Sequence, residues 1–325
     1  MEIIRSLEQL PAQYQHGAVS IGNFDGVHRG HALLIDRLRH WAKQVGGPAI
    51  VFTFDPHPVR ILRPEMAPPP LTWTERKADL LAQQGVDLLV AYPATAQMLA
   101  MSHDAFFQSI IVQRLAARAM VEGPNFLFGK DRLGNIDELK RLCRDAQMEL
   151  EIVDGLHSDS SMVSSSRIRS LIKQGDIDAA REMLTEPYRI RGLVTHGDGR
   201  GAQLGFPTAN IGGIDTLVPG PGVYGGRAIA SVGTFSAAIH VGPNPTFGDA
   251  SLKVECHLLD FDGSLYGQPL EVEFHTRIRD VYRFDSADQL LEQIKADVHA
   301  VRAWTKTRAR SAPIPNQPNA IDKAP

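Results

Sequence analysis

Short apolar segments alternate with amphipathic helical patterns through the first half of the chain. The segment at 18–22 (AVSIG) reads as a strand, and residues 31–46 place apolar side chains at helical spacing. A second strand pattern, AIVFTF at 49–54, ends where two prolines follow. The alternation continues to about residue 185 and predicts a parallel sheet with helices on both faces.

The pattern changes near residue 185. Beyond it, short β-branched segments are separated by Gly and Pro, which is typical of a small antiparallel barrel. One amphipathic helix is predicted at 286–304, with Ser286 as its N-cap. Residues 306–325 contain four prolines and no periodicity. We therefore expect domains at 1–185 and 186–305, followed by a disordered tail at 306–325.

The composition excludes several classes of protein. A formal net charge of -3 gives no electrostatic reason to expect nucleic acid or an anionic membrane as a partner. The two cysteines, Cys143 and Cys256, have no metal-like spacing, so we expect both to be buried as small apolar side chains. The N-terminus lacks a secretory apolar region, and no run is long enough to span a bilayer, so a cytoplasmic protein is expected.

The segment GNFDGVHRGH, residues 22–31, lies where a strand turns into a helix. His28 and His31 are three residues apart and so share one face of that helix. The start of a helix attracts phosphate, and imidazole N–H groups can donate hydrogen bonds to phosphate oxygens. Glycines in the turn allow the backbone to approach a ligand closely. The segment therefore predicts a phosphate site at the carboxyl end of the sheet.

GNFDGVHRGH resembles the H-x-G-H signature of the nucleotidylyltransferase superfamily, in the form typical of bacterial bifunctional riboflavin kinase/FAD synthetases. The segments TFDPHP at 53–58, EGPNFLFGKDRLGN at 122–135 and SSSRIR at 164–169 follow in the family's order. The resemblance implies an α/β Rossmann-like nucleotidylyltransferase domain with a parallel sheet, then a small antiparallel β-barrel riboflavin kinase domain with a C-terminal helix.

The resemblance also implies the residues of the adenylyltransferase site. His28 and His31 would be catalytic and hold the ATP phosphates, beside Gly22 and Asn23 of the same turn. A second segment would close over the phosphates, and a third would line the nucleotide and flavin pocket. These residues are Ser164, Ser165, Ser166 and Arg169 in the closing segment, and Asn125 and Phe128 in the pocket.

The residue types suit adenylyl transfer from ATP to FMN. An oxygen of the FMN phosphate can attack the α-phosphorus while pyrophosphate leaves, so no protein nucleophile is needed. Catalysis then consists mostly of alignment and charge neutralisation. Mg²⁺ is expected to bridge the phosphates, and Arg169 supplies a fixed fork of donors.

The segment HGDGRGAQLGFPTANI, residues 196–211, resembles the riboflavin kinase motif. Pro207 stiffens the turn, and Thr208 and Asn210 present oxygens on one side of an extended segment. The family implies that these two residues bind Mg²⁺ carried by ATP phosphates. It also implies a flap over the nucleotide that includes Gly197, Gly199, Gly205 and Pro207.

The segment VECHLLDFDGSLYGQ, residues 254–268, matches the family's glutamate-bearing strand. Glu255 would be the general base for the ribityl 5′-hydroxyl, whereas alternation alone favours a polar residue on a wet strand face. Arg279 is a candidate for the flavin loop. Ala202 and Val281 depart from the family pattern, which usually has a basic residue and a glutamate there.

The resemblance implies a bifunctional enzyme that converts riboflavin to FMN and FMN to FAD. ATP is the co-substrate of both steps, and FMN and FAD are substrate and products. One alternative is an FAD synthetase whose kinase domain is inactive or weakened. Another is a non-catalytic sensor of flavin or nucleotide. His57 and His240 are expected to be solvated or capping residues, and the sequence gives no basis for an oligomeric state.

Overall fold

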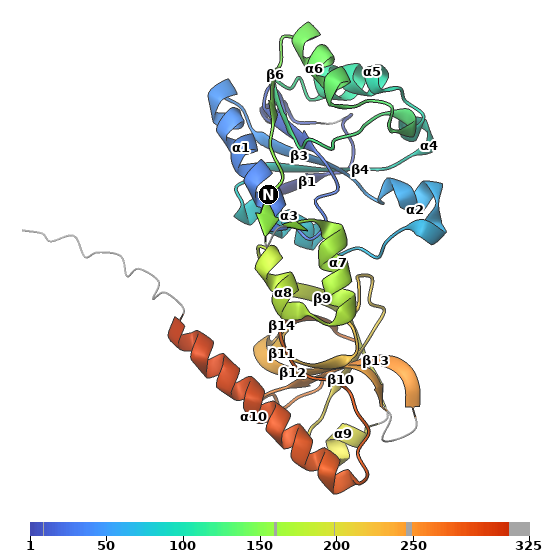
Figure 1. Ribbon diagram of the computed structural model, residues 1–325, viewed down its shortest axis with the longest axis vertical. Coiled ribbons are helices and arrows are strands. Elements are labelled where there is room, and N and C mark those ends of the chain that lie inside the picture. Colours follow the sequence, from blue (N-terminus) through green and yellow to red (C-terminus); the bar gives the residue numbers. More distant parts are fainter. Residues whose placement is uncertain (9, 159–160, 198, 245–248, 312–325) are drawn as a thin grey trace, which may run out of the picture. The chain divides into compact units, whose positions relative to one another are not determined.

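The computed structural model describes all residues except 9, 159–160, 198, 245–248 and 312–325. It divides into two compact units (Figure 1). The first comprises Met1–Gly192 and Gly213–Gly220, and the second comprises Leu193–Gly212 and the chain from Pro221 onward. The division falls within strand β9 (Tyr188–Thr195), a few residues beyond the predicted meeting point at 185 and 186. The short segment at 213–220 returns to the first unit.

The first unit is built on a six-stranded sheet with the order β1-β4-β3-β2-β5-β6, and its neighbouring strands pair in parallel. The predicted parallel sheet is therefore confirmed. The strands are β1 Glu2–Ile4, β2 Ala18–Ile21, β3 Ala49–Phe54, β4 Leu88–Tyr92, β5 Ala119–Glu122 and β6 Glu149–Ile152.

Two apolar clusters cover the two faces of this sheet. Alternate strand residues face opposite sides, so Ile50 and Phe52 join one cluster while Ala49 and Val51 join the other. The α-helices of this unit are α1 Arg29–Val45, α2 Pro58–Leu62, α3 Thr74–Gln83, α4 Ala96–Leu99, α5 His103–Phe106, α6 Ile136–Asp145, α7 Ser165–Gln174 and α8 Ile177–Met183. Its 3-10 or π segments are η1 Ala12–Tyr14, η2 Pro64–Met66, η3 Phe107–Arg114 and η4 Lys130–Arg132. Two short strands, β7 His157–Ser158 and β8 Ser161–Met162, form a separate antiparallel pair.

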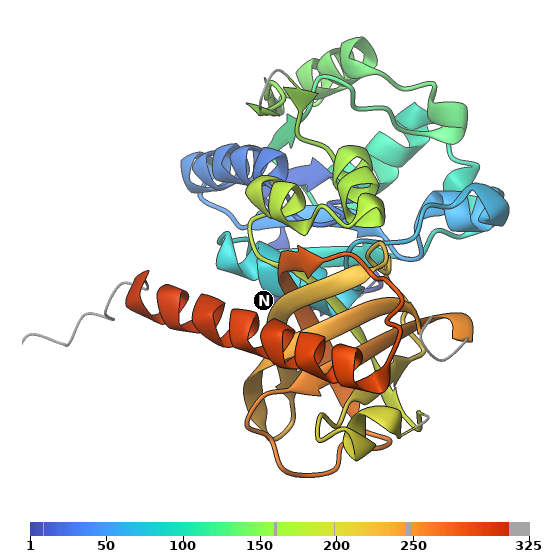
Figure 2. The same ribbon diagram turned by 60° about the horizontal axis from the view of Figure 1, so that its bottom comes forward.

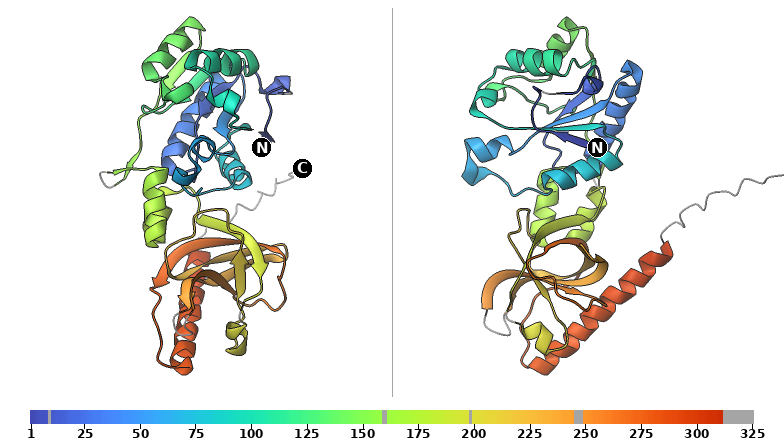
Figure 3. Two further views of the ribbon diagram at one scale, coloured as in Figure 1. Left: turned by 90° about the vertical axis from the view of Figure 1, so that its right-hand side faces the viewer. Right: turned by 180° about the vertical axis from the view of Figure 1, so that it is seen from behind.

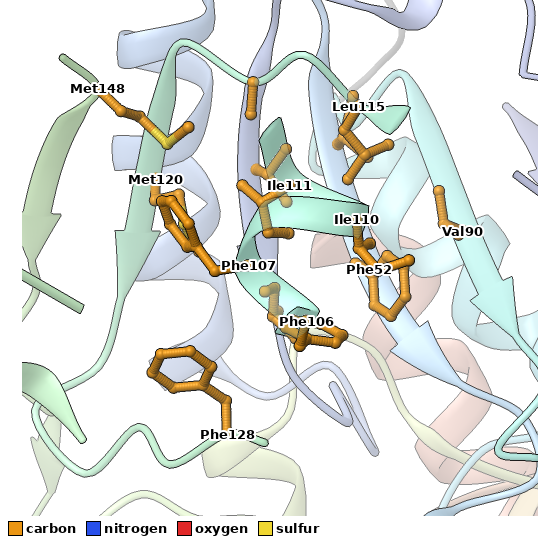
Figure 4. Close-up of a cluster of buried hydrophobic side chains, with 14 of the residues drawn as sticks. Phe52, Val90, Phe106, Phe107, Ile110, Ile111, Leu115, Met120, Phe128 and Met148 are labelled. Atoms are coloured by element: carbon orange, nitrogen blue, oxygen red, sulfur yellow. The ribbon is translucent and has the colours of Figure 1, made fainter. Parts of the chain in front are cut away.

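The helices α1 and α3 supply buried residues to the cluster that contains Ala49 and Val51. Segments α5, η3 and α6 cover the opposite face. Figure 4 shows Phe106 and Ile110 near Phe52, and Phe107 near Met120 of the sheet. Both faces are therefore sealed, and the strand ends are the parts of the sheet left open for a ligand.

Strand β2 pairs with both β3 and β5. The chain proceeds from β2 through β3 to β4 on one side, and through β5 to β6 on the other. The order thus reverses between β2 and β5. In open α/β sheets ligands bind outside the carboxyl ends of strands at such a point. The segment GNFDGVHRGH follows β2 at this position.

The second unit is a closed barrel with the order β10-β13-β12-β11-β14-β9, and its described strand pairings are antiparallel. The predicted small antiparallel barrel is confirmed. Its further elements are α9 Arg200–Gln203, β10 Ala209–Gly212, β11 Gly222–Ala230, β12 Gly233–Asn244, β13 Asp249–Leu258, β14 Pro269–Arg279 and α10 Ala287–Ser311.

Helix α10 packs along the outside of the barrel against β11 and β12 (Figures 2 and 3). The predicted C-terminal helix is confirmed, and it continues to Ser311, beyond the predicted start of the tail at residue 306. The rest of the expected tail, 312–325, lies outside the described residues. Cys143 and Cys256 are both buried and unpaired, as expected. Within the described residues, no helix has the length and apolar character needed to cross a membrane.

Candidate active sites

The turn between β2 and α1 has an unusual backbone. Phe24 and Val27 have positive φ angles of 45° and 38°, which is rare for residues with side chains and rarest for β-branched ones. Gly26 has φ 82°, and a Cβ there would lie 2.9 Å from the side chain of Leu71. Such strain persists only where the surroundings enforce it, and it is common at ligand sites.

His28 and His31 lie together at the start of α1. Their rings are stacked with centroids 3.6 Å apart, and the His31 backbone N–H donates to His28 Nδ1 at 3.2 Å. His28 is therefore the N-cap of the helix, and its ring proton is placed on Nε2. Burial lowers the pKa of His28 to about 4 and also lowers the pKa of His31. Both rings are thus neutral at pH 7.

His31 has a polar atom that the protein does not satisfy. Its Nδ1 is buried, and no hydrogen-bond partner for it is found among the described residues. A buried polar atom without a partner costs free energy unless a ligand or water engages it. The atom is therefore consistent with the predicted contact to phosphate.

The serines predicted to close over the phosphates lie at the start of α7. Ser164 caps the helix by accepting from the Arg167 N–H, and Ser165 donates to the carbonyl oxygen of Asp25 at 2.8 Å. A Cβ on Gly30 would lie 3.5 Å from the Val163 carbonyl oxygen. The starts of α1 and α7 are therefore close together, whereas the side chain of Ser166 is exposed.

Arg169 is already engaged with protein groups. Its Nη2 is ion-paired with Asp25, and its Nε donates to the Pro69 carbonyl oxygen at 2.9 Å. Asp25 also accepts from the backbone N–H groups of Leu71 and Thr72 and from the Thr72 hydroxyl. Asp25 thus ties the turn after β2, the segment before α3 and helix α7 together. Composition and spacing gave no signal for this role of Asp25.

A polar cavity of about 290 Å³ opens beside this turn. Asn23 and Arg169, which the sequence predicted, line it. The sequence analysis missed the other polar residues of its wall, although the DPHP and TERK segments were visible as a strand end and a helix. They include Asp25, Asp55, His57, Thr74 and Lys77. His57 is indeed a capping residue, since its Nδ1 accepts from the Val59 N–H at the start of α2.

Asn125 and Phe128 are not among the residues lining this cavity. The side chain of Asn125 is exposed on the loop after β5. Phe128 is only 7% exposed and stacks on Phe126 with centroids 5.2 Å apart. Figure 4 shows it below Phe106 at the edge of the apolar cluster. The structure therefore places Phe128 in the core of the domain.

Glu122, at the end of β5, is a buried carboxyl group that accepts from the Ile21 N–H at 2.7 Å. Burial raises its pKa well above the ordinary value, against the smaller effect of that hydrogen bond. The folded protein therefore keeps Glu122 protonated at a pH where the unfolded chain ionises it. The resulting loss of stability grows as pH rises above the ordinary Glu value of about 4.3.

We expect Glu122→Gln to be more stable than the wild type at pH 8, by on the order of 1 kcal/mol. The difference should shrink towards pH 4, because both proteins are then uncharged at this position. Urea unfolding at several pH values measures it. Glu149→Gln, at an exposed position of the neighbouring strand β6, is the matched control and should show no such trend. A stability difference between Glu122→Gln and the wild type that is the same at all pH values would contradict the raised pKa of Glu122.

In the second unit, a cavity of about 160 Å³ brings together the predicted kinase residues Thr208, Asn210 and Glu255. Asn210 and Glu255 are direct register partners on β10 and β13. Directly opposed residues on adjacent strands have their Cβ atoms roughly 4.5–5.5 Å apart. The FPTAN segment and the distant glutamate therefore meet in one site.

The glycine-rich segment before β10 is shaped around these residues. A Cβ on Gly197 would lie 2.1 Å from Asn210 Nδ2, so only glycine leaves room for that side chain. Gly199 and Gly205 have φ angles of 69° and 85°, which glycine adopts readily. The carbonyl oxygen of Pro207 accepts from the ring N–H of His257 at 2.8 Å, which ties the turn to β13.

His240 is a residue of the kinase cavity that the sequence analysis missed. It lies opposite Glu255 on the neighbouring strand β12, and its Nε2 contacts the Pro243 carbonyl oxygen at 3.2 Å. It is half-buried, and burial lowers its pKa while the charge of Glu255 acts in the opposite direction. A sequence separation of 15 residues across a hairpin gave no local signal for this pairing.

Arg279 lines the same cavity but is held by Asp297 of α10. Its Nε and Nη2 donate to the two carboxylate oxygens at 3.0 and 2.7 Å. Its guanidinium also stacks over the rings of Tyr282 and Phe284. Arg279 thus fastens the loop after β14 to the helix, and Val281 of that loop faces the cavity.

Comparison with known proteins matches a separate family model to each half of the chain. The FAD synthetase family model matches residues 10–167, and the riboflavin kinase model matches residues 184–305. Two relatives are described as bifunctional riboflavin kinase/FMN adenylyltransferase. The protein from Pseudomonas fluorescens is 36% identical to this chain, and the match covers 93% of this chain and 97% of the relative. The protein from Escherichia coli K12 is 30% identical, and the match covers 94% of this chain and 98% of the relative.

A crystal structure described as a macrolide-efflux protein from Streptococcus pneumoniae aligns with a TM-score of 0.82 and 30% identity, over 93% of this chain and 99% of that one. Two unrelated signatures, the paired imidazoles after β2 and the FPTAN turn with its glutamate, thus occur in one chain with both matching family models. The chain belongs to the family of bifunctional riboflavin kinases/FMN adenylyltransferases.

Proposed function

We propose that the two activities of this enzyme take place at the two cavities described above, each with its own ATP. The chain phosphorylates riboflavin to FMN and adenylylates FMN to FAD, releasing pyrophosphate. ATP and flavins are its small-molecule substrates. The first unit carries the FAD synthetase residues, and the second carries the riboflavin kinase residues.

In the adenylyltransferase site, we assign His28 and His31 to the ATP phosphates. Neutral imidazoles donate through one N–H each, and the unsatisfied Nδ1 of His31 supports this role. Gly22 and Asn23 would present the backbone of the same turn. The phosphate oxygen of FMN attacks the α-phosphorus, and the bond to the leaving pyrophosphate breaks. The protein aligns the two phosphates and neutralises their charge.

The start of α7 would close this site. Ser164, Ser165 and Ser166 offer the helix N-terminus to phosphate oxygens. Arg169 would contribute through Nη1, which has no hydrogen-bond partner among the described residues, while Nη2 holds Asp25. Asn125 and Phe128 would line the nucleotide and flavin pocket, which requires Phe128 to present a ring edge from its place in the core.

In the kinase site, Glu255 would accept the proton of the ribityl 5′-hydroxyl as its oxygen attacks the γ-phosphorus of ATP and ADP leaves. General-base catalysis of this kind contributes about 10²–10⁴-fold. Gly197, Gly199, Gly205 and Pro207 would form the flap over the nucleotide, and Arg279 would hold the flavin loop through Asp297. His240 would stay neutral opposite Glu255, since burial lowers its pKa.

The donors in the kinase site fit Mg²⁺. Thr208 and Asn210 offer neutral oxygens beside a carboxylate, and glycine at 197 leaves the room that Asn210 needs. Hard cations prefer such oxygens, and Mg²⁺ usually binds also through substrate phosphates. When bound, the ion would neutralise phosphate charge. Among the described residues no cluster of three or more His, Cys, Asp and Glu side chains forms a separate metal site.

The observation that carries this proposal is the meeting of Thr208, Asn210 and Glu255 in one cavity, with a separate imidazole pair in the other unit. We place the reaction in the cytoplasm, where ATP and free flavins are available. Small molecules would be the partners, with no role for nucleic acid or membrane, in keeping with a net charge of -3.

Incubation with riboflavin, ATP and MgCl₂, followed by separation of the flavins, tests the proposal. FMN should appear first and FAD should accumulate. Untouched riboflavin with continued conversion of added FMN would reveal a weakened kinase, for which Ala202 and Val281 are the candidate causes. Flavin bound stoichiometrically without turnover would instead indicate a sensor.

A further inference from the structure

Lys77 lies in the wall of the polar cavity next to the β2 turn. It belongs to the first turn of α3, whose buried residues Ala78 and Leu81 anchor the helix in the core. The helix has no side-chain cap at its start, and Trp73 and Thr74 also line the cavity. The free N–H groups and the positive end of α3 are therefore presented on the same side as the ammonium group.

The carboxylates around Lys77 are committed to other donors. Asp25 accepts four hydrogen bonds from backbone and hydroxyl groups and pairs with Arg169. Asp55 accepts from the Thr74 hydroxyl at 2.6 Å. Within the part of the chain that the structure describes, Lys77 has no side-chain hydrogen bond and no carboxylate within ion-pair distance.

The other cations of the cavity wall are already engaged or exposed. Arg169 pairs with Asp25, Arg5 contacts Asp55 and Glu75, and Arg191 pairs with Asp215. Arg60 is exposed. Of the described residues that line the cavity, Lys77 therefore combines a half-buried side chain with the absence of an ion pair.

Lys77 also acts electrostatically on two histidines, of which His57 lines this cavity and His31 does not. Its charge acts on His31, at the start of α1, and on His57, at the start of α2. It shares the cavity wall with Asn23 of the turn after β2 and with Asp55 and His57 of the DPHP segment after β3. Burial lowers its pKa, although Asp25 and Asp55 act in the opposite direction. A half-buried cation without an ion pair costs stability in such a place, which points to a ligand.

We propose that the Lys77 ammonium group is a direct ligand of the reacting phosphates in adenylyl transfer, placed where the FMN phosphate meets the α-phosphate of ATP. The two groups are anions that repel each other, and a compact point charge between them offsets that repulsion. The FMN oxygen forms the new bond to the α-phosphorus. The bond from that phosphorus to the bridging oxygen breaks, and its electron pair leaves with pyrophosphate. Lys77 keeps its protons throughout.

Lys77→Met tests this role because it keeps the length and apolar stem of the side chain and removes the charge. Lys43→Met, at an exposed position in the last turn of α1, is the matched control. We expect kcat/KM for FMN adenylylation to fall about 10²-fold in Lys77→Met and to be unchanged in the control. Lys77→Arg should recover part of the loss, since the charge returns.

Two further measurements distinguish catalysis from folding. The riboflavin kinase rate of the same protein should stay at the wild-type value in all variants. The melting temperature of Lys77→Met should equal or exceed that of the wild type, because the substitution removes a charge without a partner. A structural lysine would instead give a lower melting temperature.

Separate KM values for FMN and ATP identify the phosphate that Lys77 contacts. A rise in KM for FMN alone places it on the FMN phosphate, and a rise for ATP alone places it on the triphosphate. A fall in kcat with both KM values unchanged places it on the transferring group. Wild-type adenylylation by Lys77→Met would overturn the proposal. So would a loss of both activities together with a lower melting temperature.

Discussion

Replacing Glu255 with Gln should slow the riboflavin kinase reaction by about 10²–10⁴-fold and leave FMN adenylylation at the wild-type rate. The amide keeps the size of the side chain and its place opposite Asn210 on the neighbouring strand. It cannot accept the hydroxyl proton as readily as a carboxylate, so the loss should fall on kcat. Initial rates of FMN formation from riboflavin measure one activity, and rates of FAD formation from added FMN measure the other.

The matched control is Glu271→Gln on strand β14, which removes a carboxylate of the same barrel from a position outside the kinase cavity. It should leave both rates unchanged. Kinase activity retained in Glu255→Gln would show that another group accepts the proton. His240, which lies opposite Glu255 on β12, would then be the next residue to replace.

Local sequence pattern was sufficient for the architecture. The alternation of AVSIG, AIVFTF and the helices between them predicted the parallel sheet, because each strand buries alternate residues in two apolar clusters. The loss of helical spacing after residue 185 predicted the barrel. The FPTAN turn and Glu255 were expected in one site, and their strands are adjacent. The sheet and the barrel follow from local periodicity, whereas the shared site of the FPTAN turn and Glu255 was implied by the family resemblance.

Pairings between distant residues could not be predicted in this way. Arg169 contacts Asp25 across a sequence separation of 144, and the segment at 213–220 returns to the first unit after β10 has entered the barrel. Neither the contact of Arg169 with Asp25 nor the return of residues 213–220 is signalled by a periodic pattern in the local sequence. Lys77 has no local signal in the sequence, because the cavity that it lines is formed by the loops after β2 and β3 as well as by its own helix. The hydrophobic pattern specifies which face of an element is buried, whereas polar partners across the sheet ends depend on the assembled fold.

His31→Ala should lower FMN adenylylation about 10³-fold and leave the riboflavin kinase rate unchanged. The substitution removes the ring whose buried Nδ1 has no partner among the described residues, together with its stacking on His28. The adenylylation rate should therefore fall further than it would after removal of a single hydrogen-bond donor at the edge of the site. His40→Ala, at an exposed position of the same helix α1, is the control and should retain both rates.

His28→Asn separates capping from catalysis at the same turn. Asparagine is a good N-cap, so its side-chain oxygen can still accept from the His31 N–H while the Nε2 donor is lost. We expect a melting temperature close to that of the wild type and a strongly reduced FAD synthetase rate. Because burial lowers the pKa of His28 to about 4, protonation breaks its cap bond only below about pH 5. The wild-type rate should therefore not depend on an imidazolium between pH 6 and pH 8, and a rate that falls across that range with the pKa of a histidine would contradict neutral phosphate donors.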